Sequence, residues 1–184
     1  MIKKDKKLNY DVGIVGLGYV GLTLGAAFAK SGLKVLGVEK RKDIVSLVSK
    51  GKAHFAELGL EQILTEQVNN GNLIAKNKFE SSDHCRHFII TVGTPLDAKG
   101  KPRLDMIKSA VSDIINQIKD GSIIIVRSTV QIGTTRNCVD AELKKTKKKY
   151  LLAMCPERTL EGNAIKELNI LPQIIGSDDR DTFN

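Results

Sequence analysis

The sequence predicts an α/β protein with a Rossmann-like, doubly wound parallel sheet in a single domain. Short apolar runs, typical of buried strands, alternate along the chain with segments whose apolar residues recur at helical spacing. A glycine-rich turn, GLGYVG at 16–21, follows the first of these runs. The chain has 184 residues, 41% of them hydrophobic, so it is long enough to bury one substantial core.

The expected strands are the apolar runs YDVGIV at 10–15, LKVLGVE at 33–39, FIITV at 88–92, SIIIV at 122–126 and YLLAM at 150–154. Helical spacing of apolar residues predicts helices over 22–32, 44–48, 60–68 and 105–121, with Gly32 and Gly121 closing the first and the last. Ligands of such sheets bind beyond the carboxyl ends of the strands. The residues that follow each run are therefore the candidates for function.

The glycines at 16, 18 and 21 have the G-x-G-x-x-G spacing of a dinucleotide-binding turn. The first permits a tight turn, the second lets a pyrophosphate approach the backbone, and the third lets the next helix pack closely. The basic start and the apolar stretch ending in AAFA also resemble a secretion signal. However, Asp11 interrupts the junction at which a signal should turn apolar, and five glycines within 13–25 would each weaken a helix by roughly 1 kcal/mol. We therefore expect the turn to hold a pyrophosphate at a helix N-terminus.

Glu39 stands at the end of the second expected strand, 18 residues after Gly21. A carboxylate there is placed to accept hydrogen bonds from both ribose hydroxyls and would repel the additional phosphate of NADP, so NAD is the expected cofactor. Lys40, Arg41 and Lys42 follow directly and could reduce that discrimination, which leaves NADP as the alternative.

The net charge of +8 comes from two short runs. Residues 3–7 contribute +3 and five lysines between 144 and 149 contribute +5, so the rest of the chain is neutral. No aromatic residues are interleaved with these lysines, and we expect neither a nucleic-acid surface nor membrane insertion.

Cysteines and histidines give no pattern of a disulfide framework or a metal site. Cys85, Cys138 and Cys155 are odd in number and widely spaced, and the three histidines complete no ligand set. This usage fits a reducing compartment, so we predict a cytoplasmic protein without a bound metal.

Three segments follow the later strands: GTP at 93–95, RSTV at 127–130 and CPERTLEG at 155–162. Each has an ordinary structural explanation: a turn at Thr94, a helix cap at Ser128, or a pairing of Glu157 with Arg158 or solvent. Glu161 could likewise simply begin a helix. Because all three follow strands at one edge of one sheet, we expect them to form a single site with the glycine-rich turn.

In this order VGLGYVGL, VGTP, RSTV, CPER…EG and PQIIG resemble the N-terminal NAD-binding domain of the UDP-glucose/GDP-mannose dehydrogenase family, from about Asp11 to Ser177. The segment PERTLEG is more similar to the branch that acts on UDP-N-acetylhexosamines such as UDP-N-acetylmannosamine. The resemblance implies oxidation of the C6 alcohol of a UDP-sugar to a carboxylate, in two steps with two NAD, in surface polysaccharide synthesis. It also implies a homo-oligomer at full length.

The resemblance implies roles for individual residues as well. Gly16, Gly18, Tyr19, Val20 and Gly21 would bind the pyrophosphate of the cofactor, and Glu39 would bind its ribose. The rest of the cofactor would lie beside Gly93, Thr94, Pro95, Ser128, Thr129 and Glu161. Thr129 and Glu157 would be catalytic, with Glu157 orienting or activating a water that hydrolyses a thioester. Arg158, Thr159 and Leu160 would join Glu157 in contacting the nucleotide sugar.

Two positions depart from the family's pattern, and several of its parts are expected outside this chain. Glu39 stands where Asp is common, and Ile44 where a basic residue is frequent. The nucleophilic cysteine in its Gly-rich motif, an upstream Lys and Asn, the central helix and the C-terminal UDP-binding domain would lie beyond residue 184. We expect a basic tail over 1–10, the NAD-binding domain over 11–184, and SDDRDTFN as the first turn of a further helix capped by Ser177 or Asp178.

By this interpretation the chain alone binds NAD weakly and does not turn over UDP-sugars. The alternatives are a truncated, catalytically inactive NAD-binding or interaction protein, and a dehydrogenase of similar fold that acts on hydroxy acids or acyl-CoA.

Overall fold

Six parallel strands form the sheet of this protein, for which a computed structural model describes residues 9–183. The strands are β1 (Tyr10–Val15), β2 (Val35–Val38), β3 (Leu73–Lys76), β4 (Cys85–Ile90), β5 (Ser122–Val126) and β6 (Tyr150–Met154). They lie in the order β3-β2-β1-β4-β5-β6, and every neighbouring pair is parallel. This is the doubly wound order of dinucleotide-binding sheets, so the predicted fold class is confirmed.

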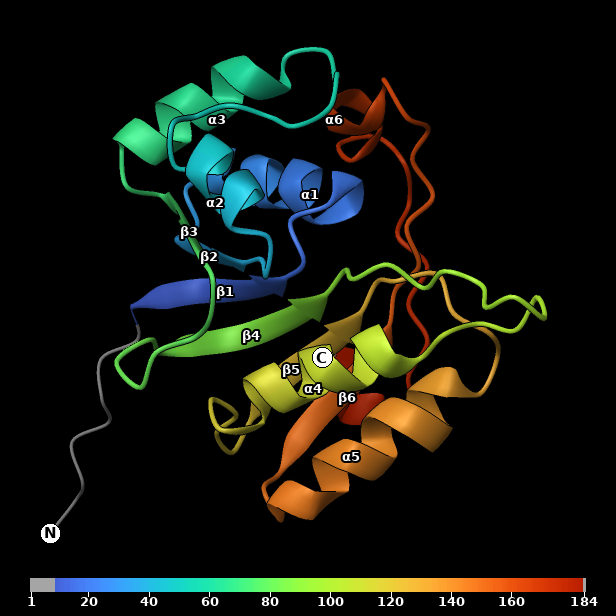
Figure 1. The fold of residues 1–184 in the computed structure, drawn as a ribbon. Coiled ribbons are helices and arrows are strands. Elements are labelled where there is room, and N and C mark those ends of the chain that lie inside the picture. The colour runs from blue at the N-terminus through green and yellow to red at the C-terminus, as the bar shows by residue number, and fades with distance from the viewer. Residues whose placement is uncertain (1–8, 184) are drawn as a thin grey trace, which may run out of the picture.

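Helices cover both faces of the sheet (Figure 1). One face carries α1 (Tyr19–Lys30), α2 (Lys42–Val48), α3 (Leu60–Asn69) and the short α6 (Ala164–Glu167). The other carries α4 (Asp105–Ile115) and a continuous helical run made of η1 (Thr135–Asp140), α5 (Ala141–Leu143) and η2 (Lys144–Thr146). Alternate residues of β1 point to opposite faces of the sheet: Ile14 packs under α1, and Val15 faces the α4 side.

Several predicted elements differ from the structure, among them α1, which begins at Tyr19 and ends at Lys30, and β2, which spans only Val35–Val38. Strand β4 begins and ends earlier than predicted, at Cys85 and Ile90, and α4 ends at Ile115 rather than near Gly121. Strand β3 was not predicted, because this four-residue edge strand is buried fully only at Leu73. The helical run over 135–146 was also missed, since its buried apolar positions are only Cys138, Val139 and Leu143.

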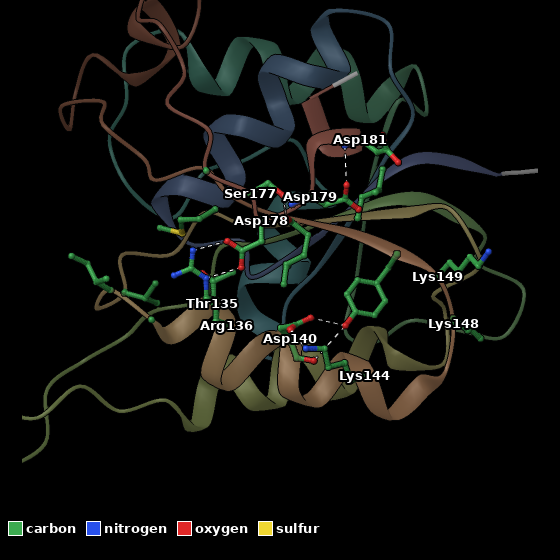
Figure 2. Close-up of a pocket in the computed structure, with 18 of the residues that line it drawn as sticks. Thr135, Arg136, Asp140, Lys144, Lys148, Lys149, Ser177, Asp178, Asp179 and Asp181 are labelled. Atoms are coloured by element: carbon green, nitrogen blue, oxygen red, sulfur yellow. Dashed lines mark hydrogen bonds and ion pairs between the residues drawn. The ribbon is translucent and has the colours of Figure 1, made fainter.

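The edge strand β6 borders a groove with a volume of about 1240 Å³ (Figure 2). Met154 and Gly176 exchange two backbone hydrogen bonds of 2.8 Å across part of this edge. Ser177 accepts the N–H of Asp179 just before a short 3-10 helix, η3 (Arg180–Phe183), near the predicted helix start. Strands β4 and β5 separate this groove from β1. The predicted basic tail falls almost wholly on residues 1–8, outside the described residues.

The carboxyl ends of the six strands meet at one edge of the sheet (Figure 1). There the chain continues into the glycine-rich turn after β1, Glu39 after β2, Thr91 after β4, Arg127 after β5 and Cys155 after β6. Over residues 9–183, no helix combines the length and apolar character needed to cross a bilayer. The candidate site is therefore built at this edge.

Candidate functional site

The glycine-rich turn leaves no room for side chains at its first and third glycines. Gly16 has φ +95°, a left-handed conformation that favours glycine, and an added Cβ would lie 3.2 Å from the carbonyl oxygen of Thr91. At Gly21 an added Cβ would lie only 1.9 Å from the carbonyl oxygen of Gly16. Gly18 differs, because a Cβ there would meet no atom within 4 Å in the structure. The turn therefore packs tightly on its protein side and is open at its centre.

The N-terminus of α1 supplies backbone donors at this open position. The first intrahelical bond runs from the N–H of Leu22 to the carbonyl of Gly18 at 2.9 Å, and Gly18 provides no side-chain cap. The N–H groups of Tyr19, Val20 and Gly21 precede it and have no intrahelical acceptor. Together with the helix dipole, these donors suit a pyrophosphate. The residues present therefore fit a dinucleotide.

The Glu39 carboxylate lies against the same turn. One oxygen accepts the N–H of Leu17 at 3.0 Å and the other accepts the N–H of Arg41 at 3.0 Å. A carboxylate has about four acceptor positions, so two remain for the ribose hydroxyls. The sequence placed this side chain at the ribose without anticipating that it also fixes the glycine-rich turn.

Two of the three basic residues after Glu39 are paired with other carboxylates. Lys40 reaches α4, where it bonds to Ser109 and forms a 3.2 Å ion pair with Asp113. Arg41 pairs with Asp43 at 2.5 Å. Their ion pairs are made with these acids rather than with Glu39, so the geometry favours NAD over NADP.

Thr91 was not predicted as a site residue, yet it secures the turn from the neighbouring strand. It is buried, and its hydroxyl oxygen lies 2.7 Å from the carbonyl oxygen of Gly16 and 3.0 Å from that of Val15. A hydroxyl donor at this distance satisfies the turn's backbone. Its signal in the sequence is weak, because the apolar run FIITV predicts Thr91 as part of the strand, whereas β4 ends at Ile90.

Hydrogen bonds join the segments after β4 and β5. The Thr94 hydroxyl donates to the carbonyl of Thr129 at 2.6 Å, and the Ser128 hydroxyl donates to the carbonyl of Val92 at 2.7 Å. Gly93, Pro95 and Thr129 are exposed at the rim. The structure thus brings together two segments that were predicted to share one site.

Glu157 is held in a buried ion pair with Arg127, a residue that was not among the predicted site residues. The two side chains are only 6% and 9% exposed, and the Nε and Nη2 atoms of Arg127 lie 3.0 and 2.8 Å from the same carboxylate oxygen. The other oxygen accepts the N–H groups of Arg158 at 2.7 Å and Thr159 at 2.9 Å. The remaining Nη1 of Arg127 donates to Gln173 at 2.9 Å.

These contacts determine the ionisation of Glu157. Burial acts to raise the pKa of this carboxyl, but the Thr159 and Arg158 N–H groups and the Arg127 charge together bring the pKa below its ordinary value. Glu157 is therefore a fixed anion at neutral pH. Such a group is better suited to orienting a water than to removing a proton from it.

The other predicted sugar-binding residues follow Glu157 on the surface. Arg158 and Leu160 are exposed and Thr159 is half-buried, while the Arg158 guanidinium donates to the carbonyl of Pro172 at 3.2 Å. Glu161 is exposed beside them. Their roles toward a nucleotide sugar stay predictions.

The three cysteines are buried, and Cys155 is the one that lies at this rim. Burial raises the pKa of Cys85 to about 12 and also raises that of Cys138. Cys155 is 6% exposed, with its Sγ 3.2 Å from Nη1 of Arg127. A nucleophilic thiolate needs access and a low pKa, which Cys85 and Cys138 lack.

A doubly wound sheet with a glycine-rich turn after β1 and an acidic residue after β2 defines the dinucleotide-binding domain of a dehydrogenase. Residues 10–184 match the NAD binding domain of the UDP-glucose/GDP-mannose dehydrogenase family. The chain belongs to this family, an NAD-dependent group of oxidoreductases, and the resemblance seen in the sequence is confirmed. NAD is therefore the cofactor of this domain.

Relatives and solved structures agree with this assignment. The UDP-N-acetyl-D-mannosamine dehydrogenases of Methanococcus aeolicus and Campylobacter jejuni are 40% and 36% identical, over 90% and 89% of this chain. The structure of the Staphylococcus aureus UDP-N-acetyl-mannosamine dehydrogenase superposes with a TM-score of 0.86 at 30% identity, over 93% of this chain. The chain spans only 37%, 42% and 42% of these three proteins.

Proposed function

We propose that this chain is the NAD-binding part of a dehydrogenase that oxidises the C6 alcohol of UDP-N-acetylmannosamine to a carboxylate, with two NAD per sugar. The single observation that carries the proposal is the meeting of five strand ends at one edge. There the N–H groups at the start of α1 follow β1, and the Glu157 side chain follows β6 at the same edge. The relatives named for UDP-N-acetyl-D-mannosamine support the choice of sugar.

Different residues of the chain are proposed to bind different parts of NAD. Gly16, Gly18, Tyr19, Val20 and Gly21 would hold the pyrophosphate, Glu39 the ribose, and Gly93, Thr94, Pro95, Ser128, Thr129 and Glu161 the nicotinamide side. Bound NAD supplies an acceptor for the electron pair removed from the alcohol carbon. The Thr94–Thr129 and Ser128–Val92 hydrogen bonds would keep this side of the rim in place.

At the sugar side, Glu157 and Thr129 would orient the reacting groups, while Arg158, Thr159 and Leu160 would contact the nucleotide sugar. Because Arg127 and two N–H groups hold Glu157 as an anion, its proposed role is to accept a hydrogen bond from water. We further propose a cytoplasmic enzyme of surface polysaccharide synthesis that assembles as a homo-oligomer.

The longest reading frame that contains this chain provides the direct test. Purified product should reduce NAD with UDP-N-acetylmannosamine, followed by absorbance of the reduced nicotinamide, at about two NAD per sugar. UDP-glucose and GDP-mannose serve as comparison substrates. Turnover of either of these in preference to the N-acetylated sugar would contradict the proposed substrate.

For the 184-residue chain alone we expect NAD binding by calorimetry but no turnover of UDP-N-acetylmannosamine. The reason is that it carries no accessible thiolate within the described residues, since all three cysteines are buried. The same burial leaves NAD binding without catalysis as the second candidate function of this chain. A full reading frame that binds NAD and oxidises none of the three sugars would support that candidate, whereas clear turnover by the 184-residue chain would contradict our expectation.

Cofactor choice gives a further prediction at Glu39. Replacement Glu39→Ser removes the carboxylate that would repel a 2′-phosphate and that accepts the N–H of Leu17. We expect NAD affinity to fall by about tenfold or more, the range for charged hydrogen bonds, and the preference for NAD over NADP to narrow. Calorimetric titrations with both cofactors would measure this. Glu66→Ser, a change at an exposed acid on α3 away from Glu39, is the matched control and should leave both affinities unchanged.

A further inference from the structure

Glu57 lies in the loop between α2 and α3, outside all the motifs that built the candidate site, yet its carboxylate contacts two of them. One oxygen accepts the Tyr19 hydroxyl at 2.5 Å and the N–H of Gly162 at 2.8 Å. The other oxygen accepts the N–H of Ile165 at 3.3 Å. Tyr19 belongs to the glycine-rich turn and Gly162 ends the segment CPERTLEG. We call Tyr19, Glu57 and Gly162 the Glu57 bridge.

On the side of the dinucleotide site, packing holds the Tyr19 member of the bridge in place. Tyr19 is the first residue of α1, and its ring contacts that of Phe55 with centroids 4.9 Å apart. Phe55 packs in turn against the core beneath α1 and α3. Burial and the hydrogen bond to Glu57 raise the pKa of Tyr19 to about 12, so the hydroxyl remains a donor at neutral pH. A short O–H···O⁻ bond of this kind is among the stronger neutral-to-charged contacts in proteins.

On its other side, the Glu57 bridge binds Gly162, at the end of the segment 157–162. This segment follows β6 but extends away from it. Strands β4 and β5 lie between β6 and β1, so the chain after β6 must cross both to reach α1. Figure 1 shows it running along the carboxyl edge to α6, which lies beside α1. Carboxylates hold this crossing at both ends: Glu157 with Arg127 at its start, and Glu57 at its end.

We propose that Glu57 is a positioning residue that couples the dinucleotide site to the sugar-binding segment 157–162, so that NAD binding at the turn orders that segment. The proposal rests on the proposed function, because it takes the turn as the NAD site and 157–162 as the sugar contact. Glu57 itself faces Tyr19 and Gly162 rather than the open space at Gly18, so it acts through them. Two motifs whose bridged residues, Tyr19 and Gly162, are 143 residues apart in sequence would in this way respond together to one ligand.

The test combines two readouts on the 184-residue chain, with NAD itself as the ligand. Calorimetry gives the NAD affinity, and amide hydrogen exchange with and without NAD gives the protection of 16–22 and of 158–165. Glu57→Gln keeps the size of the side chain but turns an NH₂ donor toward groups that are themselves donors. Glu61→Gln is the matched control, because Glu61 is exposed on α3 and its side chain forms no hydrogen bond or ion pair with any residue in 9–183.

In the unaltered chain and in Glu61→Gln, NAD should slow exchange over both 16–22 and 158–165. In Glu57→Gln we expect NAD to bind about fivefold to tenfold more weakly and to protect 16–22 alone, since the turn is less pre-organised and the second segment is released. Tyr19→Phe keeps the ring on Phe55 and removes the hydroxyl, so it should change both readouts in the same direction. If Glu57→Gln does not fold, Tyr19→Phe tests the proposed coupling in its place.

Equal NAD-dependent protection of 158–165 in Glu57→Gln and in the unaltered chain would overturn the coupling, even if Glu57→Gln unfolds more easily. That pattern would mean that Glu57 serves stability alone. NAD protection of 16–22 without any effect on 158–165 in the unaltered chain would also overturn it, while leaving the NAD site intact. Absence of NAD binding by the unaltered chain would instead contradict the proposed function as well.

Discussion

Replacement Gly21→Ala should destabilise the domain by about 3 kcal/mol or more and abolish NAD binding. The added methyl carbon would lie 1.9 Å from the carbonyl oxygen of Gly16 and 2.5 Å from the hydroxyl oxygen of Thr91. Backbone cannot move aside as a flexible side chain can, so either α1 shifts away from β1 or the turn opens. Both movements displace the donors proposed for the pyrophosphate. Urea unfolding followed by circular dichroism, since the chain has no Trp, measures the first effect, and calorimetry measures the second.

Two other glycines of the same stretch serve as controls for this experiment. Gly25 lies inside α1, where an added Cβ would meet Ile14 at an ordinary 3.4 Å, so Gly25→Ala should stabilise by about 0.5–1 kcal/mol through helix propensity. Gly18→Ala projects into open space, so it should keep the fold while lowering NAD affinity by about tenfold or more. Normal stability in Gly21→Ala, or normal NAD affinity in Gly18→Ala, would contradict the assigned roles of these glycines.

The fold and the dinucleotide turn were predictable because their signals are local. Glycine spacing, continuous apolar runs and an acidic residue after the second strand each follow from a short stretch, and together they require a parallel sheet. Strand β3 carries no comparable signal, since an edge strand of four residues buries little and needs no apolar run. The helical run over 135–146 likewise shows its apolar face at only three positions.

The partners of the site's side chains could not be predicted, because they come from residues far apart in the sequence. Sequence reasoning allowed a pairing of Glu157 with its neighbour Arg158; in the structure Arg158 gives only its backbone N–H, and the guanidinium partner is Arg127, 30 residues away. Glu57 lies in a loop without a motif and meets Tyr19 only because α1 and the loop after α2 pack on the same face. Which pairs form depends on how the layers are stacked.

Arg127→Met should destabilise the domain by about 3–5 kcal/mol at pH 7, which is the usual cost of leaving one member of a buried ion pair without its partner. Met fills much of the same volume, but the Glu157 carboxylate keeps only its two N–H donors, and Gln173 loses the Nη1 donor. The double replacement Arg127→Met/Glu157→Gln removes the buried charge as well and should recover most of the lost stability. Urea unfolding of both variants measures the difference. Arg103→Met, at a pair with Asp105 in which both side chains are more than half exposed, should leave the midpoint unchanged.

The dependence on pH distinguishes this ion pair from ordinary loss of packing. Because the pKa of Glu157 is lowered in the folded chain, its contribution is fully present above the unfolded value of about 4.5 and is lost as the pH falls through the folded pKa. The gap in stability between the unaltered chain and Arg127→Met should therefore narrow as the pH falls, because the unpaired carboxyl of the variant takes up a proton at a higher pH than the paired carboxyl of the unaltered chain. A gap in stability that stays constant from pH 7 to pH 4 would indicate that Arg127 stabilises the domain through its hydrocarbon contacts rather than through its charge. In that case the charge of Arg127 would not hold Glu157 as an anion. The proposed role of Glu157 depends on that ionised state and would be contradicted.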